Sequence, residues 1–234
     1  MIKAVLFDLD GTLIPMDLKV FTKVYLSELG KVLCPLGIDS DTFVKAMLCG
    51  MKAMRANDGK RTNREVFLES FVGASGVDPE PYLERSLPFY NNEFHNVKIC
   101  TEPNDLAKVA VDLAKNNGRK VVLATNPFFP LDAQISRASW VGVNESDFEF
   151  ITSYENEYYC KPNPAYFTSI CERLGFAPEE CLMIGNDVND DMIPAREAGL
   201  DTYLVTDWVI LKEGYEWSGK QGSFCELIKY LENL

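Results

Sequence analysis

Two residue types that often build catalytic or metal sites are scarce or poorly spaced in this chain. The single histidine, His95, has no partners arranged as a catalytic triad requires, so we expect a surface or hinge position for it. The seven cysteines are odd in number and widely spaced, and none forms a C-x-x-C pair. The sequence therefore indicates neither a zinc site nor a disulfide framework, and we expect buried thiols in a reducing compartment.

Long apolar runs and excess positive charge are also lacking. No segment approaches the roughly 18 consecutive apolar residues of a membrane span. The apolar start of the chain is interrupted at Asp8 and Asp10, too early for a secretory signal. With 35 acidic and 23 basic side chains the formal net charge is -12, which repels a nucleic-acid backbone. We expect a cytoplasmic protein with no membrane partner and no nucleic-acid partner.

Short apolar runs alternate with helical patterns over much of the 234 residues, which is typical of an α/β fold with a parallel sheet. Helices are expected at about 105–116, 164–174 and 190–198, and the last two end at a glycine. The expected strands are residues 4–7, 120–124, 148–153, 181–184 and 202–205.

Residues 17–95 differ, because they carry helical spacing without a strand signal. Apolar residues recur with the period of a helix over residues 18–33. Thr62 followed by Glu65 fits a capping box at the start of another helix. The same period is seen in the methionine stripe Met47, Met51 and Met54, for which helix core is a simpler explanation than a ligand surface.

This contrast predicts two unequal domains. Residues 1–16 and 96–234 would form the α/β core, and residues 17–95 an all-helical insertion after the first strand. The alternative is one continuous fold in which these helices cover the sheet.

Four polar clusters follow expected strands or open expected helices, where open parallel sheets place their ligand crevice. The first is Asp8-Leu9-Asp10-Gly11-Thr12, in which two carboxylates one residue apart point the same way on an extended backbone. An acidic turn is the alternative explanation of this cluster. The fourth contains Asp187 and Asp191, whose repulsion calls for a cation, although an acidic helix start is also possible. Their oxygen atoms favour Mg²⁺ or Ca²⁺ over zinc.

The two middle clusters are weaker signals when each is taken alone. Thr125 and Asn126 follow a strand and offer groups that can hold phosphate oxygens, but both residue types are also common in turns. Lys161 precedes a helix opened by proline, and a surface lysine is the ordinary expectation there.

In this order the clusters resemble the four motifs of the haloacid dehalogenase-like superfamily of hydrolases. The segments that carry the resemblance are VLFDLDGTL, VVLATNP, KPNPAYF and MIGNDVNDDM. Residues 17–95 are similar in kind to the helical cap of the type-I members. The resemblance implies a Rossmann-like three-layer α/β/α core with a parallel sheet and an all-helical cap domain inserted after the first strand.

The resemblance also implies a role for each motif residue. Asp8 would attack phosphorus and form an aspartyl-phosphate, and Asp10 would act as general acid and base. Thr125, Asn126 and Lys161 would bind the substrate phosphate. Mg²⁺ would be held by Asp8, the Asp10 backbone carbonyl and Asp187, and Asp191 would orient Lys161 or a metal-bound water from behind.

Asp10 separates the reaction classes within that superfamily, because its dehalogenases lack an acid there. We therefore expect a phosphatase acting on a small phosphorylated metabolite, with a phosphomutase as the alternative. A phosphoryl-accepting signalling module and a non-catalytic scaffold rank lower. A basic cluster in the helical insertion either contacts a second anionic group of the substrate or faces water: Lys52, Arg55, Lys60, Arg61 and Arg64.

Overall fold

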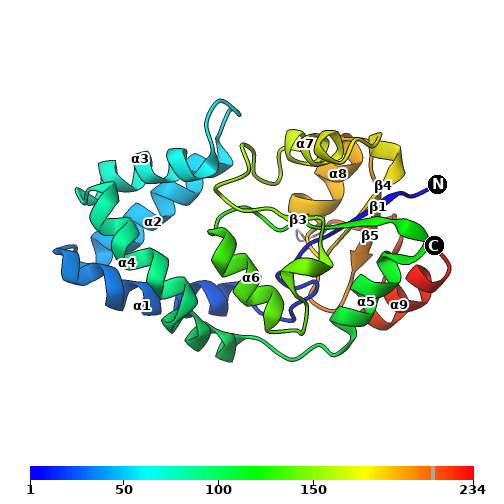
Figure 1. Ribbon diagram of the computed structural model, residues 1–234, viewed down its shortest axis with the longest axis horizontal. Coiled ribbons are helices and arrows are strands. Elements are labelled where there is room, and N and C mark those ends of the chain that lie inside the picture. Colours follow the sequence, from blue (N-terminus) through cyan, green and yellow to red (C-terminus); the bar gives the residue numbers. More distant parts are fainter. Residues whose placement is uncertain (212–213) are drawn as a thin grey trace.

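The computed structural model describes residues 1–211 and 214–234. Its centre is a parallel sheet in the order β3-β2-β1-β4-β5-β6 (Figure 1). The strands are β1 Ala4–Phe7, β2 Lys120–Leu123, β3 Phe150–Ile151, β4 Cys181–Gly185, β5 Asp201–Val205 and β6 Gln221–Gly222.

The side chains of β1 point alternately to the two faces of the sheet, and the hydrophobic core accordingly has two layers. Ala4 and Leu6 belong to one buried cluster, which includes α7 (Pro164–Leu174) and α8 (Ile193–Glu197). Val5 and Phe7 belong to the other, which includes α5, α6 and α9. Successive side chains on a strand point to opposite faces, so both faces of the sheet are covered, as Figure 1 shows. The remaining helices named here are α5 Leu106–Ala114, α6 Leu131–Ser139 and α9 Phe224–Glu232.

Between β1 and α5 the regular structure is helical. The four α-helices lie to one side of the sheet (Figure 1), and the hydrophobic cluster of Val5 and Phe7 continues into them through Phe21 and Tyr25. That residues 17–95 form a separate domain stays a prediction. The elements are α1 Leu18–Leu33, η1 Cys34–Leu36, α2 Ser40–Arg55, α3 Asn63–Ser75, α4 Pro79–Asn91 and η2 Glu93–Cys100.

Most expected elements are found, and the differences have local causes. The strand expected at 148–153 is shortened to β3. The Asn156 side chain turns the chain there, because its Nδ2 donates to Ile151 O and its Oδ1 accepts from Ser153 N. The helix expected at 190–198 is divided into a π-helical turn, η6 (Val188–Met192), and α8, which begins at Ile193 and has Pro194 in its first turn. The capping box predicted at Thr62 and Glu65 is confirmed at the start of α3.

The exposure of His95 agrees with the surface position expected for it. Its Nδ1 lies 3.2 Å from Trp140 Nε1. All seven cysteines are free thiols, but only three are buried and Cys225 is exposed, so the expectation of buried thiols holds in part. Within residues 1–211 and 214–234, none of the helices combines the length and apolar character that crossing a membrane requires.

Candidate active site

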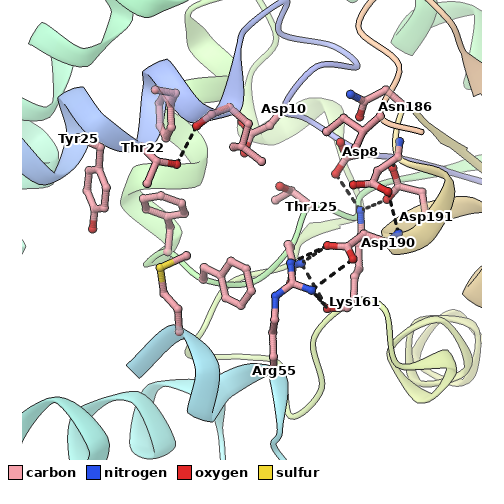
Figure 2. Close-up of a pocket in the computed structure, with 18 of the residues that line it drawn as sticks. Asp8, Asp10, Thr22, Tyr25, Arg55, Thr125, Lys161, Asn186, Asp190 and Asp191 are labelled. Atoms are coloured by element: carbon pink, nitrogen blue, oxygen red, sulfur yellow. Dashed lines mark hydrogen bonds and ion pairs between the residues drawn. The ribbon is translucent and has the colours of Figure 1, made fainter. Parts of the chain in front are cut away.

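The structure brings the predicted site residues to one cavity of about 180 Å³. They come from segments far apart in the chain, and the parallel strands β1, β2 and β4 deliver their carboxyl ends to the same edge of the sheet. Figure 2 shows this convergence. The predicted residues that line the cavity are Asp8, Asp10, Thr125, Asn126, Lys161, Asp187 and Asp191.

Lys161 is the cation at the base of this cavity. Its Nζ lies 2.8 Å from Asp8 Oδ1 and 2.6 Å from Asp191 Oδ1, and its side chain is only 1% exposed. Burial alone would lower the pKa of Lys161, but the carboxylates of Asp191 and Asp8 together raise it above its ordinary value. The ammonium group therefore stays charged and fixes the Asp8 carboxylate.

Asp191 is buried at the wall of the cavity, and both of its carboxylate oxygens are hydrogen-bonded. Its Oδ2 accepts a hydrogen bond of 3.1 Å from Asp187 N, and its Oδ1 is held by Lys161. Burial raises the pKa of Asp191, against the lowering effect of Lys161. Asp191 therefore contacts the lysine directly, and its role in orienting Lys161 or a metal-bound water stays a prediction.

Asp187 ends the loop after β4 and caps η6. Its Oδ1 accepts from the backbone N–H groups of Asn189 at 2.8 Å and Asp190 at 3.0 Å. Burial raises the pKa of Asp187, and the negative charges of Asp190 and Asp8 raise it further. The cap fixes Asp187 at the edge of an acidic cavity, where an additional positive charge would relieve repulsion.

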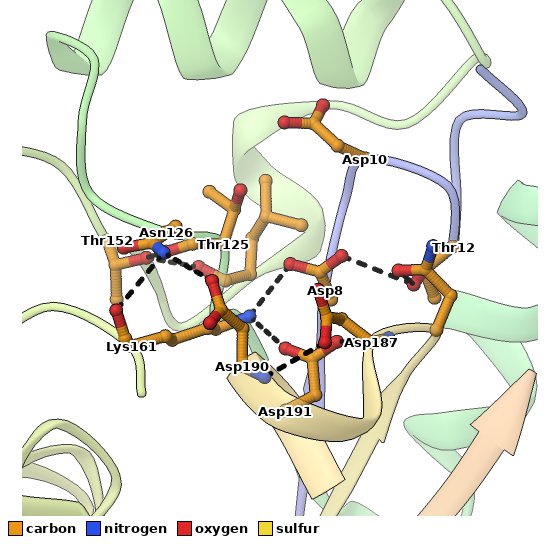
Figure 3. Close-up of polar contacts among 12 residues, drawn as sticks. Asp8, Asp10, Thr12, Thr125, Asn126, Thr152, Lys161, Asp187, Asp190 and Asp191 are labelled. Atoms are coloured by element: carbon orange, nitrogen blue, oxygen red, sulfur yellow. Dashed lines mark hydrogen bonds and ion pairs between the residues drawn. The ribbon is translucent and has the colours of Figure 1, made fainter. Parts of the chain in front are cut away.

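Thr125 and Asn126 form the opposite wall (Figure 3). The Thr125 carbonyl accepts hydrogen bonds of 2.8 Å from the hydroxyls of Thr152 and Tyr166, which hold the loop after β2 in place. The Asn126 amide nitrogen lies 3.3 Å from Asp190 Oδ2, and its Oδ1 is buried and has no hydrogen-bond partner among the residues that the structure describes. The two hydrogen bonds to its carbonyl fix the backbone at Thr125, which lines the cavity.

Asp10 is held by a residue that the sequence did not indicate. Nη1 of Arg137, on α6, lies 2.7 Å and 2.6 Å from the two carboxylate oxygens of Asp10. Figure 3 shows the Asp10 carboxylate pointing away from Asp8. Burial raises the pKa of Asp10 despite the opposing effect of Arg137.

Arg137 is itself fully buried and belongs to a wider network. Its Nη2 donates to Gln134 Oε1, and its guanidinium lies 4.4 Å from the ring centroid of Phe129 and 5.7 Å from that of Phe21. No pattern in the sequence relates this arginine to Asp10, because the contact depends on how α6 packs near the loop that follows β1.

The oxygen ligands present fit Mg²⁺. This ion uses one or two protein carboxylates and completes its octahedron with waters and substrate oxygens. Asp8 and Asp187 supply two carboxylates on one cavity. No group of three or more His, Cys, Asp or Glu side chains suited to a metal occurs in the described parts of the chain, so a cage made of protein side chains alone is not available there.

Only one member of the predicted basic cluster lines the cavity. Arg55, on α2, pairs with Asp190 of η6, with Nη2 2.7 Å from Oδ2 and Nη1 3.2 Å from Oδ1 (Figure 2). Lys60 and Arg61 instead form exposed pairs with Asp58 and Glu69. The cluster is therefore mainly surface charge, and Arg55 differs in that it also lines the cavity.

This architecture defines a class of α/β proteins in which carboxylates gather at the carboxyl ends of parallel strands, beside a buried lysine. A family model described as haloacid dehalogenase-like hydrolase matches residues 2–199. The chain belongs to the haloacid dehalogenase-like hydrolases, as the four motifs predicted.

Individual comparisons show which named enzymes this chain is similar to in sequence or in fold. The chain is 25% identical to the phosphoglycolate phosphatase of Nitrosospira multiformis, over 87% of this chain and 83% of that one. The 2-haloacid dehalogenase of Pseudomonas syringae has a similar fold, with a TM-score of 0.65, 18% identity and coverage of 100% and 99% of the two chains. A Thermotoga maritima protein described as a β-phosphoglucomutase has a TM-score of 0.59 at 18% identity, with both chains fully covered.

The family match and the phosphatase relatives confirm the prediction of a phosphatase enzyme and of a Rossmann-like parallel fold. The dehalogenase and the mutase share the fold at low identity, so the fold alone does not select the reaction. The residues of the cavity must do so.

Proposed function

We propose that the protein is a Mg²⁺-dependent phosphatase that hydrolyses a small phosphate monoester through a phosphoryl group carried on Asp8. The observation that supports this most directly is the shared cavity of Asp8, Thr125, Lys161 and Asp187. A carboxylate that attacks a phosphate dianion needs positive charge beside it and a fixed direction of approach. Lys161, 2.8 Å from Asp8, supplies one such charge.

In the proposed reaction an oxygen of Asp8 bonds to phosphorus while the bond to the leaving alcohol breaks. Asp10 gives its proton to that alcohol and then takes one from the water that attacks the phosphorus. Inorganic phosphate leaves and the Asp8 carboxylate is restored. Thr125, Asn126 and Lys161 hold the phosphate oxygens.

Asp8, Asp187 and the Asp10 backbone carbonyl would hold Mg²⁺, which supplies charge neutralisation at the phosphate. Asp191 keeps Lys161 in place. Because the Asp10 carboxylate is held by Arg137 in the structure, the proposal requires this side chain to turn toward the leaving oxygen. Residues 17–95 would act as the cap domain, and the substrate would be a metabolite of the cytoplasm.

Replacing Asp8 by Asn tests the proposal. We expect phosphate release from a panel of sugar phosphates, nucleotides, phosphoglycolate and pyrophosphate to fall by at least about 10³-fold, because an amide cannot carry the phosphoryl group. Asp112→Asn, a change at an exposed aspartate on α5, is the matched control and should keep full activity. Normal turnover by a folded Asp8→Asn protein would contradict the nucleophile assignment.

The same assay separates the two alternatives. A phosphomutase would transfer the phosphoryl group within or between sugar phosphates without stoichiometric release of inorganic phosphate. A signalling module would accumulate a long-lived phosphorylated Asp8. In ¹⁸O-labelled water the proposed phosphatase should place the label in the released phosphate, and neither alternative should do so at a catalytic rate.

A further inference from the structure

The cavity continues beyond the carboxylates into an apolar chamber. Its walls come from one face of α1, from α2 and from the loop between β2 and α6. In Figure 2 the labelled Tyr25 lies on the side of the cavity away from Asp8. The residues of this wall are Leu18, Phe21, Tyr25, Met51, Phe128 and Phe129.

The polar atoms of this wall are already bonded elsewhere. The Tyr25 hydroxyl lies 2.9 Å from the Tyr90 hydroxyl, and the Thr22 hydroxyl donates to Leu18 O at 2.7 Å. Tyr25 packs against Phe129 with ring centroids 5.0 Å apart. The chamber therefore offers carbon surface and aromatic rings to whatever occupies it.

The charges of the cavity are unsuited to a second anionic group. Among the described residues that line it, five are aspartates and only Arg55 and Lys161 are cations. Lys161 already contacts two carboxylates, and both terminal nitrogens of Arg55 contact Asp190. Inside this cavity a carboxylate or second phosphate on the substrate would have to share Arg55 with Asp190 or break a pair of Lys161, and either choice weakens its binding.

We propose that the alcohol portion of the natural substrate is uncharged and apolar, an alkyl or aryl group no larger than about one ring. The size limit follows from the cavity of about 180 Å³, which has to hold the phosphate group as well as the alcohol portion. An apolar cavity of about 150 Å³ holds one benzene ring, so there is no room for an alcohol portion larger than that. This inference rests on the proposed phosphatase function and names its substrate class. It separates this chain from relatives named for phosphoglycolate, whose leaving group carries a carboxylate.

A homologous series of esters tests the inference at constant leaving-group chemistry. With Mg²⁺ present, kcat/KM should rise about fourfold per added methylene from ethyl to propyl to butyl phosphate, as expected when each group leaves water for an apolar wall. Phenyl phosphate should be turned over efficiently, and 2-phosphoglycolate at least about tenfold more slowly than propyl phosphate. A flat series, or a preference for 2-phosphoglycolate, would overturn the inference.

A cationic leaving group is tested with a pair of equal shape. Phosphocholine and 3,3-dimethylbutyl phosphate differ by a quaternary nitrogen in place of carbon. Aromatic rings near carboxylates also suit a quaternary ammonium group, so the comparison is a demanding one. We expect the neutral ester to be preferred, and a tenfold preference for phosphocholine would refute an uncharged substrate.

A matched pair of variants on α2 assigns the preference to the chamber. Met51 lines it, whereas Leu48 is exposed on the outer surface of the same helix. Met51→Lys should shift the ratio of butyl phosphate to 2-phosphoglycolate turnover by at least about tenfold toward the acid, and Leu48→Lys should leave it unchanged. Met51→Gln serves if the lysine variant does not fold, and it should flatten the alkyl series. An unchanged ratio in both Met51 variants would overturn the assignment.

Failure of the inference and failure of the proposed function give different results. If no ester, including the activated p-nitrophenyl phosphate, releases phosphate in a way that depends on Asp8, the phosphatase proposal itself is wrong. If turnover depends on Asp8 but favours charged leaving groups, only the substrate class is wrong.

Discussion

Arg137 is a fully buried charged side chain, and such a group is kept in a folded protein only with a partner of opposite charge. Its partner is Asp10, the residue to which we assign proton transfer, and its guanidinium also lies near the rings of Phe129 and of Phe21 on α1. One side chain thus joins the acid–base group to the wall of the substrate chamber. We regard Arg137 as a positioning residue that sets where the Asp10 carboxylate rests between turnovers.

Replacing Arg137 by Gln should lower kcat about 10- to 100-fold with a small change in KM, the range seen when a partner that orients a catalytic group is removed. Arg119→Gln is the matched control, because Arg119 is also buried but donates to carbonyls of α5 beside the start of β2, at the opposite end of that strand from the cavity. If Arg137 acts through Asp10, adding Arg137→Gln to Asp10→Asn should cause no further loss of kcat. Fully additive losses would contradict that role.

The buried carboxyl group of Glu157 leads us to expect that the folding stability, rather than the catalytic rate, depends on pH. It is buried, with Arg173 3.7 Å away, and burial raises its pKa to about 8 in spite of that arginine. In the unfolded chain the carboxyl ionises near its ordinary pKa of 4.5. Its stabilising contribution is therefore complete below about pH 4.5 and is lost as the pH rises toward 8, because folding must then bury a charge or retain a proton.

Glu157→Gln should remove this loss, since the amide stays neutral. Relative to the parent protein, the variant should gain about 2 to 4 kcal/mol of unfolding free energy between pH 5 and pH 8.5. Urea unfolding at several pH values measures the difference. Glu149→Gln, at an exposed pair with Lys120, should show no such trend, and parallel pH profiles for Glu157→Gln and the parent would refute the prediction.

Among the helical elements, the contact between α2 and α3 depends on a glycine. A Cβ atom built on Gly50 would lie 2.5 Å from the Phe67 ring, so the two helices pack closely only because this position has no side chain. Gly73, inside α3, has open space around the same atom. Replacing each of these two glycines by alanine therefore distinguishes the effect of close packing from the effect of helix propensity.

Gly50→Ala should destabilise the protein by about 1 to 3 kcal/mol through overpacking, although alanine favours the helix. Gly73→Ala should stabilise it by about 0.5 to 1 kcal/mol, because the backbone of alanine loses less conformational entropy. Thermal or urea unfolding of both variants measures the difference in sign. Equal effects would show that α2 and α3 pack less closely than described.

The elements also show what a sequence can predict. The run of Ala4 to Phe7 and the helix of Pro164 to Leu174 were predictable, because apolar periodicity and terminal glycine or proline act locally. Strand β6 was not, since Gln221 and Gly222 carry no apolar pattern and form a strand only by pairing with β5 at the sheet edge. Local patterns thus identify elements better than the tertiary contacts that modify them.

The residues of the site also fall into two groups, those that local sequence patterns could place and those that depend on tertiary packing. Asp8 and Asp187 could be placed together because each ends a strand of one parallel sheet, and strand ends meet at one edge whatever the loops do. Arg137 and Arg55 could not be placed, because each reaches its aspartate from a helix whose packing the sequence does not specify. The apolar chamber was missed for that reason, since it exists only between α1, α2 and the loop after β2.

For the whole molecule, the net charge is -12, and the described residues around the cavity include five aspartates and two cations that are already paired. A divalent cation bound there should stabilise the folded state, because the unfolded chain separates these charges. At Mg²⁺ concentrations about 100 times the Kd, the gain is about 2.7 kcal/mol. For a chain of this length that corresponds to a rise in Tm of about 5 to 10 °C.

Because general attraction of Mg²⁺ to an acidic surface would also raise the Tm, the measurement is made in about 0.15 M KCl, where exposed charges are screened beyond about 8 Å. Asp187→Asn should remove most of the Mg²⁺-induced rise in Tm, whereas Asp112→Asn, at an exposed pair on α5, should retain it. A rise of equal size in Asp187→Asn would mean that Mg²⁺ binds elsewhere. Since Tm is read without substrate, the result tests the metal site independently of turnover and of the substrate class.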